Sequence, residues 1–364
     1  MSNQLYLATR KGLFTAERSG AGSWAVTGSA FVGDPVTMLL DDARDGTLYA
    51  ALNLGHFGVK LHRSTDRGKT WDECAAPAFA GESKEKDDKT EGPSVHQVWE
   101  LVPGGADQPG KLWAGTIPGA LFVSEDRGSS WNLVESLWNV PERSNWFGGG
   151  YDDPGIHSIC IHPEDHDHLS VGVSCGGFWV SRDGASSWEV RTQGMHAAYM
   201  PPERREDPSI QDPHRVAHCR AHPEVLWVQH HNGVFRSTDG GRQWSELEVP
   251  PSNFGFAVVA HPADAETAWF VPAVKDECRV PVDGKLVVAR TRDGGKTFDV
   301  LREGLPQEHT YDLVFRHALD IDASGERLAF GSTTGSVWVS ENSGDRWSAI
   351  SRHLPPIYQV LFAN

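Results

Sequence analysis

One eight-residue pattern recurs along the chain and constrains its fold more than any other feature. This turn motif reads Ser/Thr-x-Asp-x-Gly-x-x-aromatic. Its Asp can accept backbone N–H groups across a tight turn, while its Gly takes a positive φ. Clear copies lie at 64–71, 124–131, 237–244 and 291–298, looser copies lie at 181–188 and 340–347, and a degenerate copy ends at Trp24. We therefore expect the motif aspartates to be structural rather than catalytic: Asp66, Asp126, Asp183, Asp239 and Asp293.

The spacing of the motif predicts the architecture. The closing aromatic residues follow one another at intervals of 47–60 residues: Trp24, Trp71, Trp131, Trp188, Trp244, Phe298 and Trp347. A period near 50 residues with about four strands per unit is typical of propeller blades. We therefore predict an all-β fold, a single seven-bladed β-propeller formed by residues 1–364. The apolar segment 358–363 follows the last motif, and adding it to blade one as the inner strand closes the ring and removes exposed sheet edges.

Composition restricts the partners. The formal net charge of −16 argues against nucleic acids and anionic membranes, because both require a basic surface. No apolar run approaches the roughly 20 residues that span a bilayer, and residues 1–10 lack the pattern of a signal peptide. The five cysteines are odd in number and have no CxxC spacing, which favours reduced thiols and a cytoplasmic location. A monomer is the expectation for a closed ring.

Histidines that do not belong to the repeat are the strongest candidates for function. Aligning the blades by the turn motif places four of them where inner strands begin, at one opening of the central channel: His96, His157, His214 and His317. Neutral imidazoles bind divalent Zn, Mn, Fe or Cu. We therefore predict these four as ligands of a divalent metal of unknown identity. In the alternative interpretation, they hydrogen-bond water and backbone in a wet channel.

The loops after the second strands should reach the same opening. They supply candidate substrate-binding residues, to which a long connection at 136–156 adds Trp146: Arg10, Lys11, His56, His230, Lys275 and Trp146. Arg10 and Lys11 would bind an anionic group of the substrate. His231 is a candidate base or further metal ligand, Tyr358 a candidate acid, and Glu203 a candidate catalytic carboxylate on the long connection at 190–213.

The turn motif resembles the Asp-box, or BNR, repeat of sialidases, sortilin-type receptors and xyloglucanases. The whole chain is similar to bacterial exo-α-sialidase-like and glycosyl hydrolase-like proteins. This resemblance implies that the motif lies on the turn between the third and fourth strands of each blade, away from the usual active site. Sialidases use three arginines for a carboxylate, a Tyr–Glu pair as nucleophile and an Asp as acid.

Residues that could fill the sialidase roles are present, although residues 8–14 replace the family's Arg-Ile-Pro motif. The resemblance implies three arginines and a phenol paired with Glu203, chosen from Arg10, Arg279, Arg316, Tyr151, Tyr311 and Tyr358. A glycosidase of the usual kind instead needs two carboxylates about 5–10 Å apart. Candidates on the long connections are Asp152, Asp153, Glu203 and Asp207.

Three functions stay open from sequence alone. The first is a metal-dependent enzyme, performing hydrolysis, elimination or oxygen chemistry on a small or carbohydrate-like, possibly anionic substrate. The second is a metal-free glycoside hydrolase of the sialidase type. The third is a non-catalytic binding platform, a role that many propellers have.

Overall fold

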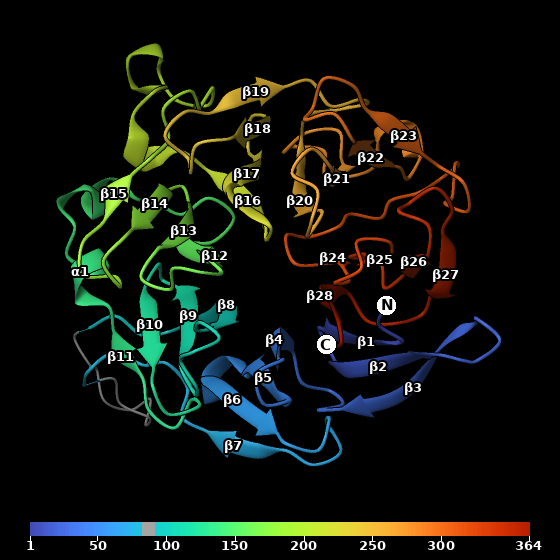
Figure 1. The fold of residues 1–364 in the computed structure, drawn as a ribbon, viewed down its shortest axis with the longest axis horizontal. Helices are drawn as coiled ribbons and strands as arrows, with labels where there is room; N and C mark the ends of the chain where they lie inside the picture. Colours follow the sequence, from blue (N-terminus) through green and yellow to red (C-terminus); the bar gives the residue numbers. More distant parts are fainter. Residues whose placement is uncertain (82–91) are drawn as a thin grey trace.

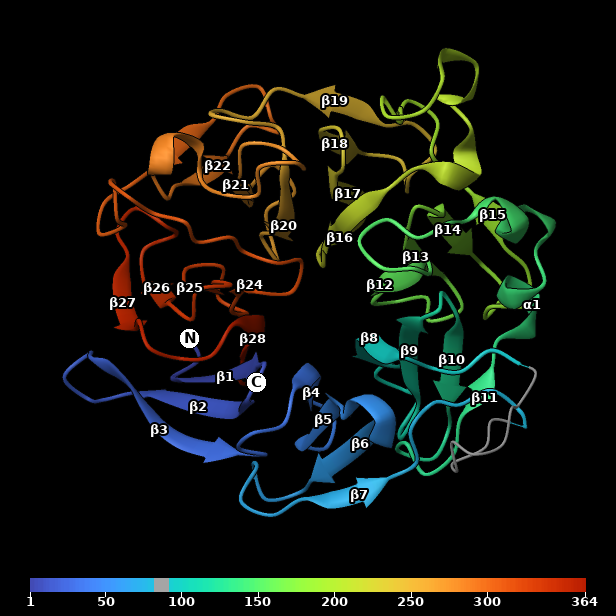
Figure 2. The ribbon, with the colours of Figure 1, turned by 180° about the vertical axis from the view of Figure 1, so that it is seen from behind.

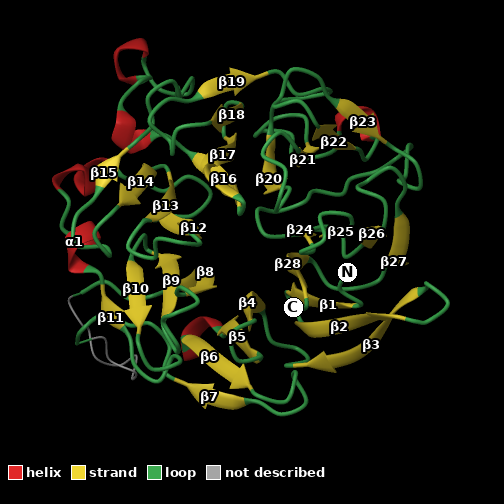
Figure 3. Ribbon diagram, viewed as in Figure 1, coloured by secondary structure: helices red, strands yellow, loops and turns green. Residues whose placement is uncertain are grey.

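The computed structural model of the chain describes residues 1–81 and 92–364. In these residues, seven four-stranded antiparallel sheets are arranged around a common axis, as Figures 1 and 2 show from the two faces of the ring. Strands form the blades and the few short helices lie in the connections (Figure 3). The predicted all-β, seven-bladed propeller is confirmed. Within the described part of the chain, no helix is both long and apolar enough to cross a bilayer.

Each blade contains four strands, ordered from the axis outward. Blade one consists of β28 (Ile357–Phe362), β1 (Gln4–Thr9), β2 (Gly12–Arg18) and β3 (Trp24–Ala30). Blade two has β4 (Val36–Asp42), β5 (Thr47–Asn53), β6 (Val59–Ser64) and β7 (Asp72–Cys74). Blade three has β8 (Gln97–Pro103), β9 (Leu112–Ile117), β10 (Leu121–Ser124) and β11 (Asn132–Leu133). Blade four has β12 (Gly155–Ile161), β13 (Leu169–Ser174), β14 (Gly177–Ser181) and β15 (Glu189–Val190).

The last three blades repeat this order. Blade five has β16 (Pro213–Cys219), β17 (His222–His230), β18 (Val234–Ser237) and β19 (Ser245–Leu247). Blade six has β20 (Gly255–Ala260), β21 (Ala268–Pro272), β22 (Val288–Thr291) and β23 (Asp299–Leu301). Blade seven has β24 (Leu319–Ile321), β25 (Leu328–Gly331), β26 (Val337–Ser340) and β27 (Ser348–Ser351). The short helices are α1 (Glu135–Trp138), η1 (Gly55–Phe57), η2 (Pro141–Asn145), η3 (Pro202–Arg204), η4 (Pro208–Ile210) and η5 (Val282–Gly284).

Blade one joins the two ends of the chain. β28 pairs antiparallel with β1, with Leu7 opposite Val360, so the C-terminal strand closes the ring as predicted. The side-chain amide of Gln359 then links blades one and two. It accepts a 2.6 Å bond from the Leu39 amide and donates a 3.1 Å bond to the Leu39 carbonyl. Closure therefore depends on backbone pairing within a blade and on a side chain that ties the blade to its neighbour.

The turn motif has the same hydrogen bonds in successive blades, and blade four illustrates them. Residues 181–188 connect the third strand β14 to the fourth strand β15. The Asp183 carboxylate accepts a 2.9 Å bond from the Ser187 amide and a 2.6 Å bond from the Ser187 hydroxyl. The Ser187 bonds and a bond from the Ser181 hydroxyl lower the pKa of Asp183 to about 2. This carboxylate is fully occupied in holding the turn, which supports its structural assignment.

Removing that carboxylate should destabilise the blade. We expect Asp183→Ala to lower the midpoint of thermal unfolding by a few degrees at pH 7, while Arg182→Ala, in the same turn, leaves it unchanged. Because the pKa of Asp183 falls from 3.8 to about 2 on folding, its contribution is complete above pH 3.8 and disappears as the pH falls toward 2. The difference between wild type and D183A should therefore shrink over that interval. Equal midpoints at pH 7 would contradict the assignment.

Six inner strands carry a β-bulge near their start. In β12, for example, the register with β13 shifts between Ile156 and Ser158, so that one residue is left without a partner. The unpaired residues at the six bulges are Tyr358, Thr37, Trp99, His157, His214 and Phe256. In β20, the neighbouring Ala257 is unpaired as well. A bulge turns a side chain away from the regular alternation of the strand. These residues form a ring around the axis at one end of the propeller.

Candidate functional site

A cavity of about 680 Å³ lies on the axis, at the end of the ring where the inner strands begin. Four bulged residues line it, namely Thr37, Trp99, Phe256 and Tyr358. The loop after β1 contributes Arg10. The sequence alignment of the blades had placed inner-strand starts and the loops after second strands at one shared opening, and the cavity lining has this composition. The remaining lining residues are Asp34, Pro35, Asn53, Leu54, Gly55, Phe57, Gln97, Gly150, Tyr151, Arg279, Phe315, Arg316 and His317.

Arg316 is the most unusual residue of the cavity. Its guanidinium carbon lies 4.8 Å from the centre of the Trp99 ring and 5.1 Å from the centre of the Phe256 ring. Its Nε atom is buried without a hydrogen-bond partner, and no described carboxylate lies within ion-pair distance of it. Burial lowers the pKa of Arg316 despite the nearby charge of Asp212. The cavity therefore contains a guanidinium with free donors, held between two aromatic rings.

Two other cationic groups and two phenols share the cavity. Arg279 lies over the Phe256 ring but is already paired with Asp276, with a 3.0 Å bond from Nε to Oδ1. Burial raises the pKa of Tyr358, whereas the neighbouring Arg10 cation opposes this rise. Tyr358 therefore keeps its proton at neutral pH. Tyr151 packs edge-on against the Trp99 ring, with centroids 5.3 Å apart.

Carboxylates are scarce in this cavity. Among the described residues that line it, Asp34 alone carries one, and its side chain is exposed at the rim. Glu203 is exposed in η3, Asp207 accepts a bond from the Ser209 amide to cap η4, and Asp153 lies 3.7 Å from a ring nitrogen of His96. The carboxylates proposed from the long connections are therefore not part of the cavity lining.

Two of the four histidines predicted as metal ligands belong to a buried polar network beside the axis. His157 is fully buried: its Nε2 donates a 2.7 Å bond to the Pro213 carbonyl and its Nδ1 is bonded to the Ser158 hydroxyl at 2.9 Å. His317 donates from Nε2 to the His157 carbonyl at 2.8 Å. Glu100, 3.5 Å from His317, forms an ion pair with Arg215. Both nitrogens of His157 are occupied, so this ring has no lone pair for a metal.

The four predicted histidines do not meet at one point. His96 precedes β8, and its side chain is 57% exposed. The alignment had equated His96 with His157, but the residue that corresponds to His157 at the bulge of blade three is Trp99. The sequence pattern was thus offset by three residues, because a bulge leaves no signature in the alternation of side chains.

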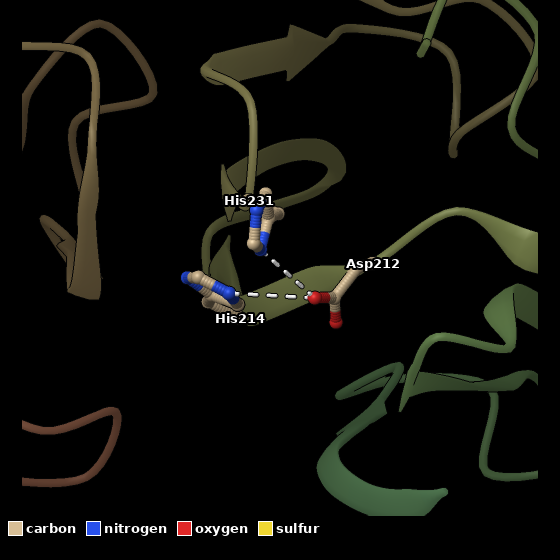
Figure 4. A group of neighbouring side chains, drawn as sticks. All are labelled: Asp212, His214 and His231. Atoms are coloured by element: carbon tan, nitrogen blue, oxygen red, sulfur yellow. Dashed lines mark ion pairs between the residues drawn. The ribbon is translucent and has the colours of Figure 1, made fainter. Parts of the chain in front are cut away.

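A different cluster brings potential ligand atoms together at the start of blade five (Figure 4). The Oδ2 atom of Asp212 lies 3.5 Å from His214 Nε2 and 3.4 Å from His231 Nδ1. Burial alone would raise the pKa of Asp212, but His214 and His231 hold it well below its ordinary value. Burial lowers the pKa of His214 although Asp212 opposes this change. Among the described residues, this is the one group of three side chains suited to hold a metal ion.

The other predicted site residues have varied surroundings. His230 is fully buried behind the cluster, where its Nε2 is 3.0 Å from the Asp212 amide and burial lowers the pKa of the ring to about 3. Trp146 packs against Trp179 in the core, with ring centroids 5.7 Å apart, so its face is not available to a ligand. Three predicted substrate-binding residues are exposed and lie outside the cavity lining: Lys11, His56 and Lys275.

Two important residues escaped the sequence analysis. Asp212 is absent from the predicted set, although the pattern Asp-x-His at 212–214 places both side chains on the same face of an extended segment and indicates the pair. Trp99 is absent because the alignment of the blades gives its place to His96. By contrast, Arg279 and Arg316 were named as possible carboxylate ligands, and both line the cavity.

Comparisons with known proteins find xyloglucanases among the relatives of this sequence. The chain is 25% identical over 323 residues to the oligoxyloglucan-reducing end-specific xyloglucanase of Emericella nidulans, covering 80% of this chain and 36% of that protein. It is 22% identical over 295 residues to a xyloglucanase of a Paenibacillus species, covering 71% of this chain and 28% of that protein. The chain thus spans about a third of the length of the curated relatives it matches. No protein-family model matches the sequence.

Solved structures extend the comparison to the fold. The GH74 xyloglucanase from Xanthomonas campestris superposes with a TM-score of 0.63 at 18% identity, covering 97% of this chain and 53% of that chain. At this level of identity, the two proteins share the propeller fold. The chain is therefore similar in sequence to xyloglucanases and similar in fold to a GH74 enzyme.

Proposed function

We propose that this protein is a glycan-acting hydrolase whose axial cavity binds a carbohydrate-like molecule through an anionic group. The observation that carries this proposal is the unpaired guanidinium of Arg316 between the rings of Trp99 and Phe256. Ligand pockets are typically lined by apolar and aromatic side chains with a few polar groups that fix orientation, and this cavity has that composition. The similarity to xyloglucanases supports a glycan as the ligand class.

The roles follow from the position of each group. Arg316 binds a carboxylate of the ligand, since a guanidinium and a carboxylate form two parallel hydrogen bonds. Arg10, in the loop after β1, also lines the cavity and contributes a second positive charge. Tyr358 stays protonated and acts as a hydrogen-bond or proton donor, while Asp34 is the one carboxylate among the described lining residues. Such a site resembles the sialidase type more than the type with two carboxylates.

A panel of glycosides with a fluorogenic leaving group tests this proposal. We expect turnover of substrates that carry a carboxylate, such as sialosides and uronides, at a kcat/KM at least about tenfold above that of neutral xylosides and glucosides. The matched chemical control is the methyl ester of the same uronide, which retains the ring and removes the charge. Equal rates for the acid and its ester would contradict the role of Arg316, and absence of any turnover would exclude hydrolase activity on these substrates.

The scarcity of carboxylates favours one second candidate, a glycan-binding platform without catalysis. With Asp34 as the single carboxylate among the described lining residues, the paired acid and base of most glycosidases are missing from the cavity. Calorimetry with uronate oligosaccharides distinguishes the two candidates. Saturable binding without product formation would establish the binding role and reject the hydrolase.

A further inference from the structure

We propose that Asp212, His214 and His231 form a binding site for a divalent transition-metal ion, with coordination positions left open for water or a ligand. Two imidazoles and one carboxylate suit Zn²⁺, Mn²⁺ and Fe²⁺. This set differs from the four histidines predicted from sequence, because His214 is the only member common to both. The assignment is independent of the proposed glycan hydrolysis, since it depends on the geometry of these three side chains alone.

The distances match those that an ion would impose. The Oδ2 atom of Asp212 is 3.5 Å from His214 Nε2 and 3.4 Å from His231 Nδ1. Two donors that each bind a zinc ion at its usual bond length, with tetrahedral angles, lie about 3.3–3.4 Å apart. A direct N–H···O bond would instead bring the atoms to about 2.9 Å. Both separations are therefore longer than an ordinary hydrogen bond and agree with a shared ion.

Hydrogen bonds around the cluster orient the lone pairs. His214 Nδ1 lies 2.7 Å from the Gly255 carbonyl, which can only accept, so in the neutral ring Nδ1 carries the proton and Nε2 presents its lone pair toward Asp212. A backbone carbonyl that fixes the tautomer in this way is characteristic of metal-binding histidines. The His214 ring also stacks on Phe256, with centroids 4.4 Å apart, which fixes its plane.

The carboxylate is held in a comparable way. Asp212 Oδ1 accepts a 3.1 Å bond from the Ser174 hydroxyl and a 3.0 Å bond from the Cys175 amide. Oδ2 is left to face the two imidazoles. The backbone of Asp212 is fixed as well, because the His231 amide donates to its carbonyl at 2.9 Å. The donors of Asp212 and His214 are thus held by the protein before any ion arrives, which reduces the entropic cost of binding.

The site lies directly behind the wall of the axial cavity. Phe256 contacts His214 on one side and lines the cavity on the other. A Cβ added to Gly149 would lie 2.9 Å from Cys175 Sγ and 3.7 Å from Asp212 Oδ2, so the backbone at Gly149 passes close to the cluster. The side chain of His231 is 22% exposed, whereas those of Asp212 and His214 are nearly inaccessible. An ion would therefore enter past His231.

Metal binding by the full chain tests the assignment. The protein is stripped with a chelator, incubated separately with Zn²⁺, Mn²⁺ or anaerobic Fe²⁺, desalted, and analysed by elemental mass spectrometry and calorimetry. We expect close to one equivalent of at least one ion in the wild type and at least about 100-fold weaker affinity in His231→Ala and Asp212→Asn. Ser174→Ala, which removes a bond to Asp212, should weaken binding about tenfold.

Controls separate this site from general histidine binding. His96→Ala removes a ligand predicted from sequence and should leave the stoichiometry unchanged. If D212N does not fold, as judged by near-UV circular dichroism, His231→Gln provides the test because this side chain is the most accessible of the three. Wild-type binding below a tenth of an equivalent with all three ions, or full binding by both His231 variants, would overturn the proposal. Glycan turnover is measured in parallel, so a failure of the hydrolase proposal is seen separately.

Discussion

Replacing Arg316 with Met should weaken binding of an anionic glycan by about 10–100-fold, while the protein stays as stable as before or becomes more stable. The loss reflects one bidentate, charge-assisted contact between the guanidinium and the ligand carboxylate, worth about 1.5–3 kcal/mol. Stability should not fall, because the Nε atom of Arg316 is buried without a hydrogen-bond partner and Met removes its desolvation cost. Calorimetry with a uronate oligosaccharide and thermal unfolding at pH 7 measure the two effects.

A second arginine variant serves as the control for this result. Arg279 also lies over the Phe256 ring, but its guanidinium is already paired with Asp276. We therefore expect Arg279→Met to weaken binding less than Arg316→Met does. A clear drop in the unfolding midpoint of R316M, together with its loss of affinity, would instead show that the Arg316 guanidinium is a structural group. The cavity would then lose its proposed anion-binding residue.

Replacing Glu100 with Gln should cost about 3–5 kcal/mol of unfolding free energy, the largest stability effect we expect from a single substitution. The variant leaves the partly buried Arg215 without its carboxylate partner, so that the His157 carbonyl is its remaining acceptor, and it removes the carboxylate beside His317. Adding Arg215→Met should restore part of the loss, since it removes the guanidinium that E100Q leaves without its carboxylate partner. Urea unfolding at pH 7 measures all three variants, and a loss under about 1 kcal/mol for E100Q would refute this account.

The same carboxylate predicts how stability depends on pH. Burial alone would raise the pKa of Glu100, but the charge of Arg215 and the contact with His317 lower it below its ordinary value of 4.5. The stabilisation is therefore complete above pH 4.5 and is lost as the pH falls through the lower pKa of the folded state. Wild type should lose stability over this acid range more steeply than E100Q does.

The fold could be predicted from the sequence because the turn motif that specifies each blade is local and repeated. Each turn motif needs only its own Asp, Gly and aromatic residue, so six copies fix the blades without knowledge of the rest. The closing strand was also predictable, because 358–363 is an apolar strand that follows the last motif and has no partner in its own unit. The structure places this strand in blade one, beside β1.

The candidate site was only partly predictable, and bulges are the physical reason. The alignment identified the correct opening, and Arg10, Tyr358 and His317 do line the cavity. Whether a ring points to the axis, however, depends on a bulge that the alternation of residues does not encode. His157 and His214 occupy equivalent bulges, yet one ring is occupied by protein hydrogen bonds while the other retains a free lone pair.

Ring closure also has a consequence for how the protein matures. Arg10 follows β1, whereas Tyr358 lies in β28, which is synthesised long afterwards, and both belong to the cavity wall. A nascent chain that still lacks β28 has six complete blades at most and an incomplete wall, so the proposed ligand site is unfinished. Ligand added during refolding should therefore trap only finished molecules, and a fluorescent ligand would report the final assembly event in real time.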